Sequence, residues 1–251
     1  MPIHPDATRP DLGAAFFSTW DVGTPERQRA AVEAIGTVWE RRPWPLPGLL
    51  SYSVYAGLDG RRLLHHSQWA AEDAHHDFVR DQRQWRNEEI DAAVPGIERL
   101  GLVRTRPYRS LAADGRDVEA DGGGRPEPGC VVVVDVEFEG PDAGRQRAWA
   151  DAVAEAMAAD PAPPAGLIAA HFHISLDGTR VVNYAEWSSE QAHIDALAAP
   201  GEGIGSPSPL WERVHRFPGR RSDTVRRYHL LFSAARPEGA ARAESAGRPA
   251  G

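Results

Sequence analysis

The sequence predicts an α+β fold in which two ferredoxin-like β-α-β-β-α-β repeats form an intrachain, pseudo-dimeric α+β barrel. Two observations carry this prediction: the second half of the chain repeats the first, and both halves show the same order of strand and helix patterns. Residues 48–77 align without a gap on residues 166–195, and eleven of these thirty positions are identical. The same shift lays residues 27–30 on 145–148, where all four are identical. The chain is therefore a duplication.

Each half begins with a strand and an amphipathic helix, continues with a β-hairpin and a second helix, and ends with another strand. In the first half these elements are expected at 14–22, 25–41, 48–57, 61–69, 70–81 and 101–111. In the second half they are expected at 130–139, 142–158, 166–175, 179–187, 188–199 and 223–234. Asp59 with Gly60, and Asp177 with Gly178, join alternating apolar runs, which is typical of a hairpin turn.

The chain is expected to divide into two domains with a linker and a tail. These segments are an N-terminal ferredoxin-like domain at 1–112, a polar linker at 113–129, a C-terminal ferredoxin-like domain at 130–235 and a disordered tail at 236–251. Irregular inserts are expected at 82–100, where a helix is possible, and at 200–222, which is rich in Gly and Pro. Each unit leaves one sheet face bare, so two units in one chain can complete a barrel. A monomer suffices for the fold, and a homodimer stays open.

Composition excludes several classes of function. The net charge is −8 and all 28 basic residues are arginine, so lysine Schiff-base chemistry is excluded and a nucleic-acid surface is not expected. No run of about 18 apolar residues predicts a membrane span. The first residues carry no apolar signal-peptide core, and the single cysteine, Cys130, excludes an internal disulfide. We therefore expect a cytoplasmic protein.

The strand at 166–175 indicates which sheet face is polar. Its aliphatic positions should pack under helices, which leaves His171 and His173 on the barrel side. The matching barrel-side positions of the first half are Ser51, Ser53 and Tyr55. A barrel-side cavity with a few polar groups would suit a small molecule. For the two histidines, a structural role and a role in substrate contact or proton handling stay open, whereas the lack of acidic or cysteine partners disfavours a metal.

The strand at 179–187 places an amide beside a tryptophan, because alternation puts Asn183 and Trp187 on one face. The first half keeps the tryptophan as Trp69 but has His65 in place of the amide. A residue kept in both halves indicates shared packing first. Asn183, where the halves differ, either bonds across the pseudo-dimer interface or contacts a substrate.

Two further pairs recur between the halves. His193 repeats His75 on a helix, where solvated histidines are the ordinary case. Tyr228 repeats Tyr108 in the last strand, as a cross-sheet anchor or as a phenol in the cavity.

The block LDGTRVVNYAEWSSEQAHIDAL resembles the antibiotic biosynthesis monooxygenase family, whose hallmark Asn-x-x-x-Trp is matched by Asn183 and Trp187. The resemblance covers roughly 14–111 and 130–234. It implies a monooxygenase that oxidises an aromatic polyketide phenol or anthrone to a quinone, with O2 as co-substrate and no metal or bound prosthetic group. In that scheme Asn183 hydrogen-bonds a substrate or peroxide oxygen, Trp187 packs on or hydrogen-bonds the ring system, and His173 assists proton transfer.

The second half is expected to hold the working site, and the first half to act as a lid or structural partner. The residues expected to contact substrate are His171, Tyr228, His193, Tyr55, His65 and Trp69. Two alternatives stay open. One is a ring-opening or ring-contracting oxygenase of angucycline-type polyketides that uses reduced flavin from a partner reductase. The other is a non-oxidative cyclase or polyketide-binding protein on the same barrel.

Overall fold

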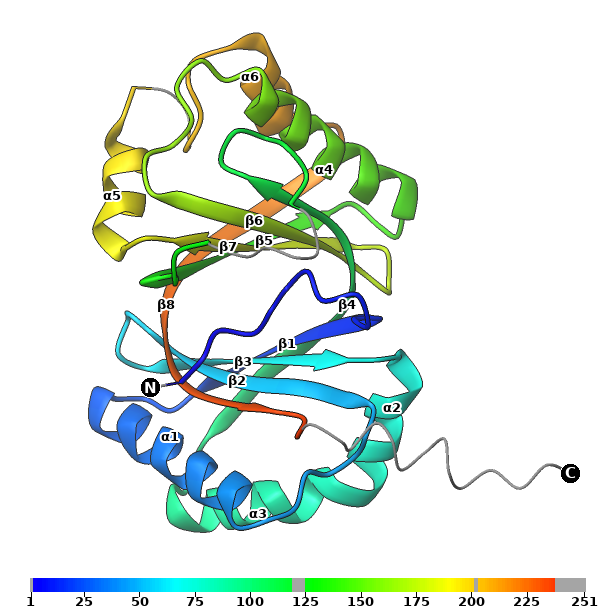
Figure 1. Ribbon diagram of the computed structural model, residues 1–251, viewed down its shortest axis with the longest axis vertical. Helices are drawn as coiled ribbons and strands as arrows, with labels where there is room; N and C mark the ends of the chain where they lie inside the picture. The colour runs from blue at the N-terminus through cyan, green and yellow to red at the C-terminus, as the bar shows by residue number, and fades with distance from the viewer. Residues whose placement is uncertain (1, 119–124, 201–202, 238–251) are drawn as a thin grey trace, which may run out of the picture. The chain divides into compact units, whose positions relative to one another are not determined.

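The computed structural model of the chain describes residues 2–118, 125–200 and 203–237 (Figure 1). The chain forms two compact units. Of the described residues, the first unit comprises Asp11–Leu102 together with 2–5 and 231–237. The second unit comprises Asp6–Pro10 and Val103–Leu230.

The first unit is a three-stranded antiparallel sheet in the order β1-β3-β2, with its helices and the start of a long strand. Its elements are β1 (Ala14–Asp21), α1 (Pro25–Glu40), β2 (Leu49–Gly57), β3 (Arg62–Trp69), α2 (Glu72–Phe78), the π-helical turn η1 (Val79–Arg83), α3 (Gln84–Ala93) and β4 (Glu98–Ala112). Strand β3 pairs with both β1 and β2. Thr24 caps α1 by accepting a hydrogen bond from the backbone N–H of Arg27, and Pro25 supplies a preset first helical residue.

The second unit repeats this order. Its elements are β5 (Cys130–Phe138), α4 (Ala143–Ala158), β6 (Leu167–Ser175), β7 (Arg180–Trp187), α5 (Glu190–Ala198), α6 (Pro209–His215) and β8 (Arg220–Ala235). Strand β7 lies between β5 and β6, and β5 also pairs with β8. Asp142 caps α4 through the backbone N–H of Arg145 at 2.9 Å. Gly178 takes a φ of 76° in the β6–β7 turn, as expected for a tight hairpin.

The last strand of each repeat is long and runs from one unit into the other. The part of β4 from Thr105 to Ala112 pairs with β6. The end of β8 belongs to the first unit, where Ser233 accepts a hydrogen bond from the backbone of Ile3 at 2.8 Å. The strand order is β1-β3-β2-β8-β5-β7-β6-β4, closed into a barrel. The predicted α+β fold with two ferredoxin-like repeats is confirmed.

The compact units differ from the predicted segments, because β4 and β8 extend beyond their own repeat. The first residues of the expected linker, 113–118, turn back onto β4, where Val118 N–H donates to Ser110 O at 2.8 Å. Residues 119–124 of the linker and 238–251 of the predicted tail lie outside the described residues. None of the helices in the described parts of the chain is long and apolar enough to cross a membrane.

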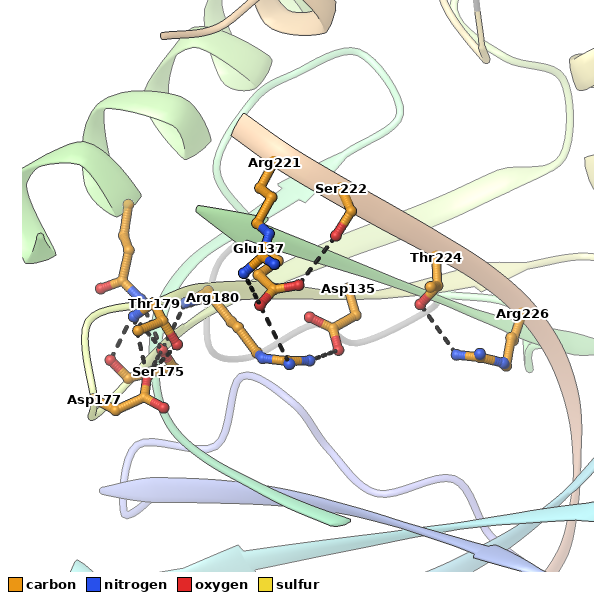
Figure 2. Close-up of polar contacts among 11 residues, drawn as sticks. Asp135, Glu137, Ser175, Asp177, Thr179, Arg180, Arg221, Ser222, Thr224 and Arg226 are labelled. Carbon is orange, nitrogen blue, oxygen red and sulfur yellow. Dashed lines mark hydrogen bonds and ion pairs between the residues drawn. The ribbon is translucent and has the colours of Figure 1, made fainter. Parts of the chain in front are cut away.

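Charged side chains mark one face of the sheet in the second unit (Figure 2). Arg180 pairs with Asp135 at 2.8 Å, and Arg221 lies 3.6 Å from Glu137. Asp135 and Glu137 alternate along β5 with Val134 and Val136, so the opposite face of this strand is apolar. That apolar face meets the helices.

One buried amide in each unit joins the first helix to the hairpin. Gln146 of α4 donates to Ser175 Oγ at 2.9 Å, and its equivalent Gln28 of α1 donates to Gly57 O at 3.0 Å. Both side chains are buried, so these bonds stand in place of hydrogen bonds to water. They explain why a glutamine recurs at this position in both repeats.

Candidate functional site

A cavity of about 350 Å³ lies on the helix-facing side of the sheet in the second unit. Strand residues on its wall include Val132, Val134, Val136 and Phe172, and helix residues include Trp149, Met157, Trp211 and Val214. Phe172 meets Trp149 edge to face with ring centroids 6.2 Å apart. The size and the apolar walls are those of a small-molecule pocket, for which volumes of roughly 300–1,000 Å³ are usual.

Four polar atoms of cavity-lining residues are buried and have no hydrogen-bond partner among the described residues. They are Oδ1 of Asn183, Nε1 of Trp187, Nε2 of His215 and Nε of Arg220. Asn183 is 9% exposed and Trp187 is 1% exposed, so water satisfies them poorly. Buried polar groups in proteins are nearly always paired. Four unpaired atoms around one apolar cavity therefore indicate a ligand that carries matching donors and acceptors.

His193 is another polar residue on the cavity wall, and its protonation state is fixed by its neighbours. Its ring meets Trp187 edge to face at 4.9 Å, and its Nδ1 accepts a hydrogen bond from Arg227 Nε at 2.9 Å. Burial, aided by the charge of Arg227, lowers the pKa of His193 to about 4. The imidazole is therefore neutral near pH 7, with its hydrogen on Nε2.

The rim of the cavity combines one ion pair with exposed apolar side chains. Arg220 pairs with Asp223 and also donates to the carbonyl oxygen of His215 at 2.6 Å. Leu197 and Val225 line the same cavity and are 40% and 45% exposed. An apolar rim of this kind suits a ligand whose ring system reaches the mouth of the pocket.

The prediction that His171, His173 and Asn183 share a cavity on the barrel side is wrong. Asn183 pairs across the strands with Phe172, whereas His171 pairs with Tyr184. Opposed residues share a sheet face and successive residues alternate, so His171 and His173 face away from the cavity. His173 donates from Nδ1 to His171 O at 3.0 Å, and burial lowers its pKa to about 3.

The remaining residues expected in the site fall into two groups. Tyr228 pairs with Val131, whose neighbours line the cavity, so Tyr228 also faces away from it. Tyr55, His65 and Trp69 belong to the first unit. Of the nine predicted site residues, the structure brings Asn183, Trp187 and His193 together; their roles stay predictions.

The first unit has an equivalent cavity that is largely filled, with a volume of about 100 Å³. Ser18 lies opposite His65, and Val134 lies opposite Asn183, the residue that matches His65 in the second repeat. Ser18 and Val134 are therefore equivalent, and two residues further along Trp20 occupies the place of Val136. Trp39 and Tyr52 likewise stand where the second repeat has Met157 and Ala170, and they stack at 4.3 Å.

The residue that replaces Asn183 in the first cavity is paired through one ring nitrogen, whereas its Nε2 and two nitrogens of Arg86 have no partner among the described residues. The hydroxyl of Tyr52 lies 2.6 Å from His65 Nδ1, and burial lowers the pKa of His65 to about 3. The amide of the second repeat has no such partner. The larger volume of the second cavity supports the expectation that the second half is the working one.

Sequence reasoning missed α6, which carries the cavity residues Trp211 and His215, and it missed Arg220 after the helix. The insert 200–222 is rich in Gly and Pro, which indicated an irregular segment. A local signal was present: Ser208 and Pro209 form a helix start, and Trp211 and Val214 lie three residues apart. Ser208 caps α6 by accepting a hydrogen bond from the N–H of Trp211 at 3.2 Å.

Metal ligands do not gather anywhere in the described part of the chain, where no three His, Cys, Asp or Glu residues are close enough to hold an ion.

The fold defines a class, the α+β barrels built from ferredoxin-like units. An anthrone oxidase-like protein superposes with a TM-score of 0.64 at 19% identity, covering 92% of this chain and 95% of that one. A candidate monooxygenase from Lactobacillus acidophilus NCFM superposes with a TM-score of 0.53 at 9% identity, covering 89% and 96%. One from Fusobacterium nucleatum gives 0.53 at 8% identity, covering 89% and 94%. The predicted resemblance is thus confirmed for the fold.

No protein-family model and no curated protein matches the sequence.

Proposed function

We propose that this protein is an oxygenase that uses O2 to oxidise a flat, electron-rich phenol or anthrone of the aromatic polyketide type to a quinone. The observation that carries the proposal is the set of unpaired polar atoms around the apolar cavity of the second unit. Neighbours of the same fold that are named as monooxygenases or as anthrone oxidase-like also support it.

The reaction needs a pocket that binds an aromatic ring system and stabilises its anion. Loss of a proton from the ring CH2 gives an enolate, which is electron-rich enough to reduce O2. A C–O bond forms, the second hydrogen leaves, and the O–O bond breaks. One oxygen atom stays on carbon as the quinone carbonyl, and the other leaves with both hydrogens as water. We propose that no metal or bound prosthetic group takes part.

The cavity residues supply orientation, water exclusion and hydrogen bonds. Asn183 Oδ1 accepts a hydrogen bond from a phenol hydroxyl, while Trp187 Nε1 donates to the oxygen on which charge develops. Phe172 and Met157 hold the ring plane between sheet and helix. The apolar walls keep water away, which strengthens both hydrogen bonds.

The test is O2 uptake with a model anthrone, together with transfer of labelled oxygen into the quinone. Asn183→Ala and Trp187→Phe are each expected to lower turnover by about 100-fold, the usual effect of losing one such hydrogen bond. Trp69→Phe makes the same change at the repeat-related position and is expected to retain turnover. Unchanged turnover in both second-unit variants would refute the site.

Two added conditions separate the alternatives. Turnover only after addition of reduced flavin would show the flavin-dependent oxygenase in place of the cofactor-independent one. Tight anthrone binding without O2 uptake under either condition would show a cyclase or binding protein.

A further inference from the structure

We propose that His215 of α6 is the residue that takes the proton from the substrate carbon. This inference rests on the proposed function and deepens it, because the structure removes His173 from the cavity and leaves the proton without an acceptor. His215 lines the cavity, and its Nε2 is buried without a partner among residues that the structure describes. A neutral imidazole with a free ring nitrogen can accept a proton there.

The ring of His215 is held in place from several sides. It stacks on Trp211 at 6.2 Å with planes inclined by 29°. Gly203 packs against it so closely that a Cβ on this residue would lie 3.0 Å from Cε1 of the imidazole. Arg220 fixes the backbone carbonyl of His215, as described above, and Asp160 accepts a hydrogen bond from Trp211 Nε1 at 2.8 Å. These contacts preorganise the side chain.

The other titratable groups on the cavity wall are already engaged. His193 accepts a hydrogen bond from Arg227 at Nδ1 and resists protonation. Asp223 and Arg220 form an ion pair with each other. His215 is therefore the cavity histidine whose acceptor nitrogen is open to a ligand.

The proton step is a simple transfer. The C–H bond of the ring CH2 breaks, its electron pair stays on carbon and spreads into the enolate, and the proton moves to Nε2 of His215. With O2 present, the imidazolium returns the proton from Nε2 to the oxygen that leaves as water, which frees Nε2 for the next turnover.

Hydrogen–deuterium exchange of anthrone in D2O without O2 isolates this step from oxidation. The enzyme is expected to exchange the ring CH2 faster than buffer does. His215→Gln is expected to lower the exchange rate and aerobic turnover by about 100-fold, within the usual contribution of a general base. His76→Gln makes the same change at an exposed histidine of the first unit and is expected to exchange at the wild-type rate.

A rescue experiment separates chemistry from structure. In His215→Ala, added imidazole is expected to restore part of the exchange, which a purely structural role would not allow. If either variant fails to fold by circular dichroism, His215→Asn takes its place, because its amide is shorter and keeps a polar atom in the cavity wall.

The outcomes distinguish this inference from the proposed function. If the unmodified protein oxidises anthrone and His215→Gln exchanges the ring CH2 at the same rate as the unmodified protein, the role of His215 is overturned and the oxygenase stays intact. If the unmodified protein exchanges the ring CH2, His215→Gln does not, and neither takes up O2, His215 is supported as the proton acceptor and the oxygenase is overturned. Neither exchange nor oxidation in the wild type would overturn both.

Discussion

Replacing Asn183 with leucine is expected to stabilise the protein while it removes activity. Oδ1 of Asn183 is buried without a partner among the described residues, beside Val134 and Phe172. A buried unpaired polar group costs about 1–3 kcal/mol, and leucine of similar size has no such group. Because the side chain is 9% exposed at the cavity, the lower end applies. We expect the free energy of unfolding to rise by about 1 kcal/mol.

The control is Tyr52→Phe, which removes a paired polar group in the first unit. It breaks the 2.6 Å hydrogen bond to His65 and leaves Nδ1 of that buried imidazole unpaired. The free energy of unfolding is expected to fall by about 1–3 kcal/mol, the opposite sign. Urea unfolding followed by circular dichroism measures both variants, and O2 uptake measures the loss of turnover in Asn183→Leu. A drop in stability of Asn183→Leu like that of the control would refute the reasoning, because the amide would then be paired.

Three further predictions concern the cavity and its support. Val136→Trp copies Trp20 of the smaller cavity and should raise KM for anthrone by about tenfold, the scale of a steric change in an apolar pocket; unchanged KM would place substrate elsewhere. Gln146→Ala removes buried hydrogen bonds between α4 and the hairpin and should lower the free energy of unfolding by about 1–3 kcal/mol in urea. Burial and Arg227 lower the pKa of His193 from 6.5 to about 4, so the unfolded chain takes up a proton first as pH falls. The associated stability is complete above pH 6.5 and is lost towards pH 4, and His193→Gln should flatten that dependence in pH-resolved urea unfolding. The same slope in that variant would contradict the assignment.

The duplication made the fold predictable, because two copies of one pattern confirm each other. Every strand expected in the sequence is present, with ends shifted by a few residues. The exchange of β4 and β8 between units was not predictable, since it depends on how far a strand continues beyond its own repeat. Local pattern indicates that a strand exists, but its partners are set by tertiary contacts.

The candidate site was predictable in part. Alternation placed Asn183 and Trp187 on one face, and they line the same cavity. It could not show that the cavity lies under the helices, because a face of mixed apolar and polar residues suits either side of the sheet. The polarity of His171 and His173 indicated the barrel side, but these residues bond to neighbours there. The volume arises from small side chains and from α6, neither of which has a strong signal in a single sequence.

The most direct test of the account is the position of a bound anthraquinone in a crystal of this protein. The account predicts a flat ring system in the helix-side cavity of the second unit, with its oxygen atoms within hydrogen-bond distance of Asn183 and Trp187 Nε1. Electron density for the ligand beside His171 and His173, or in the small cavity next to His65, would contradict it.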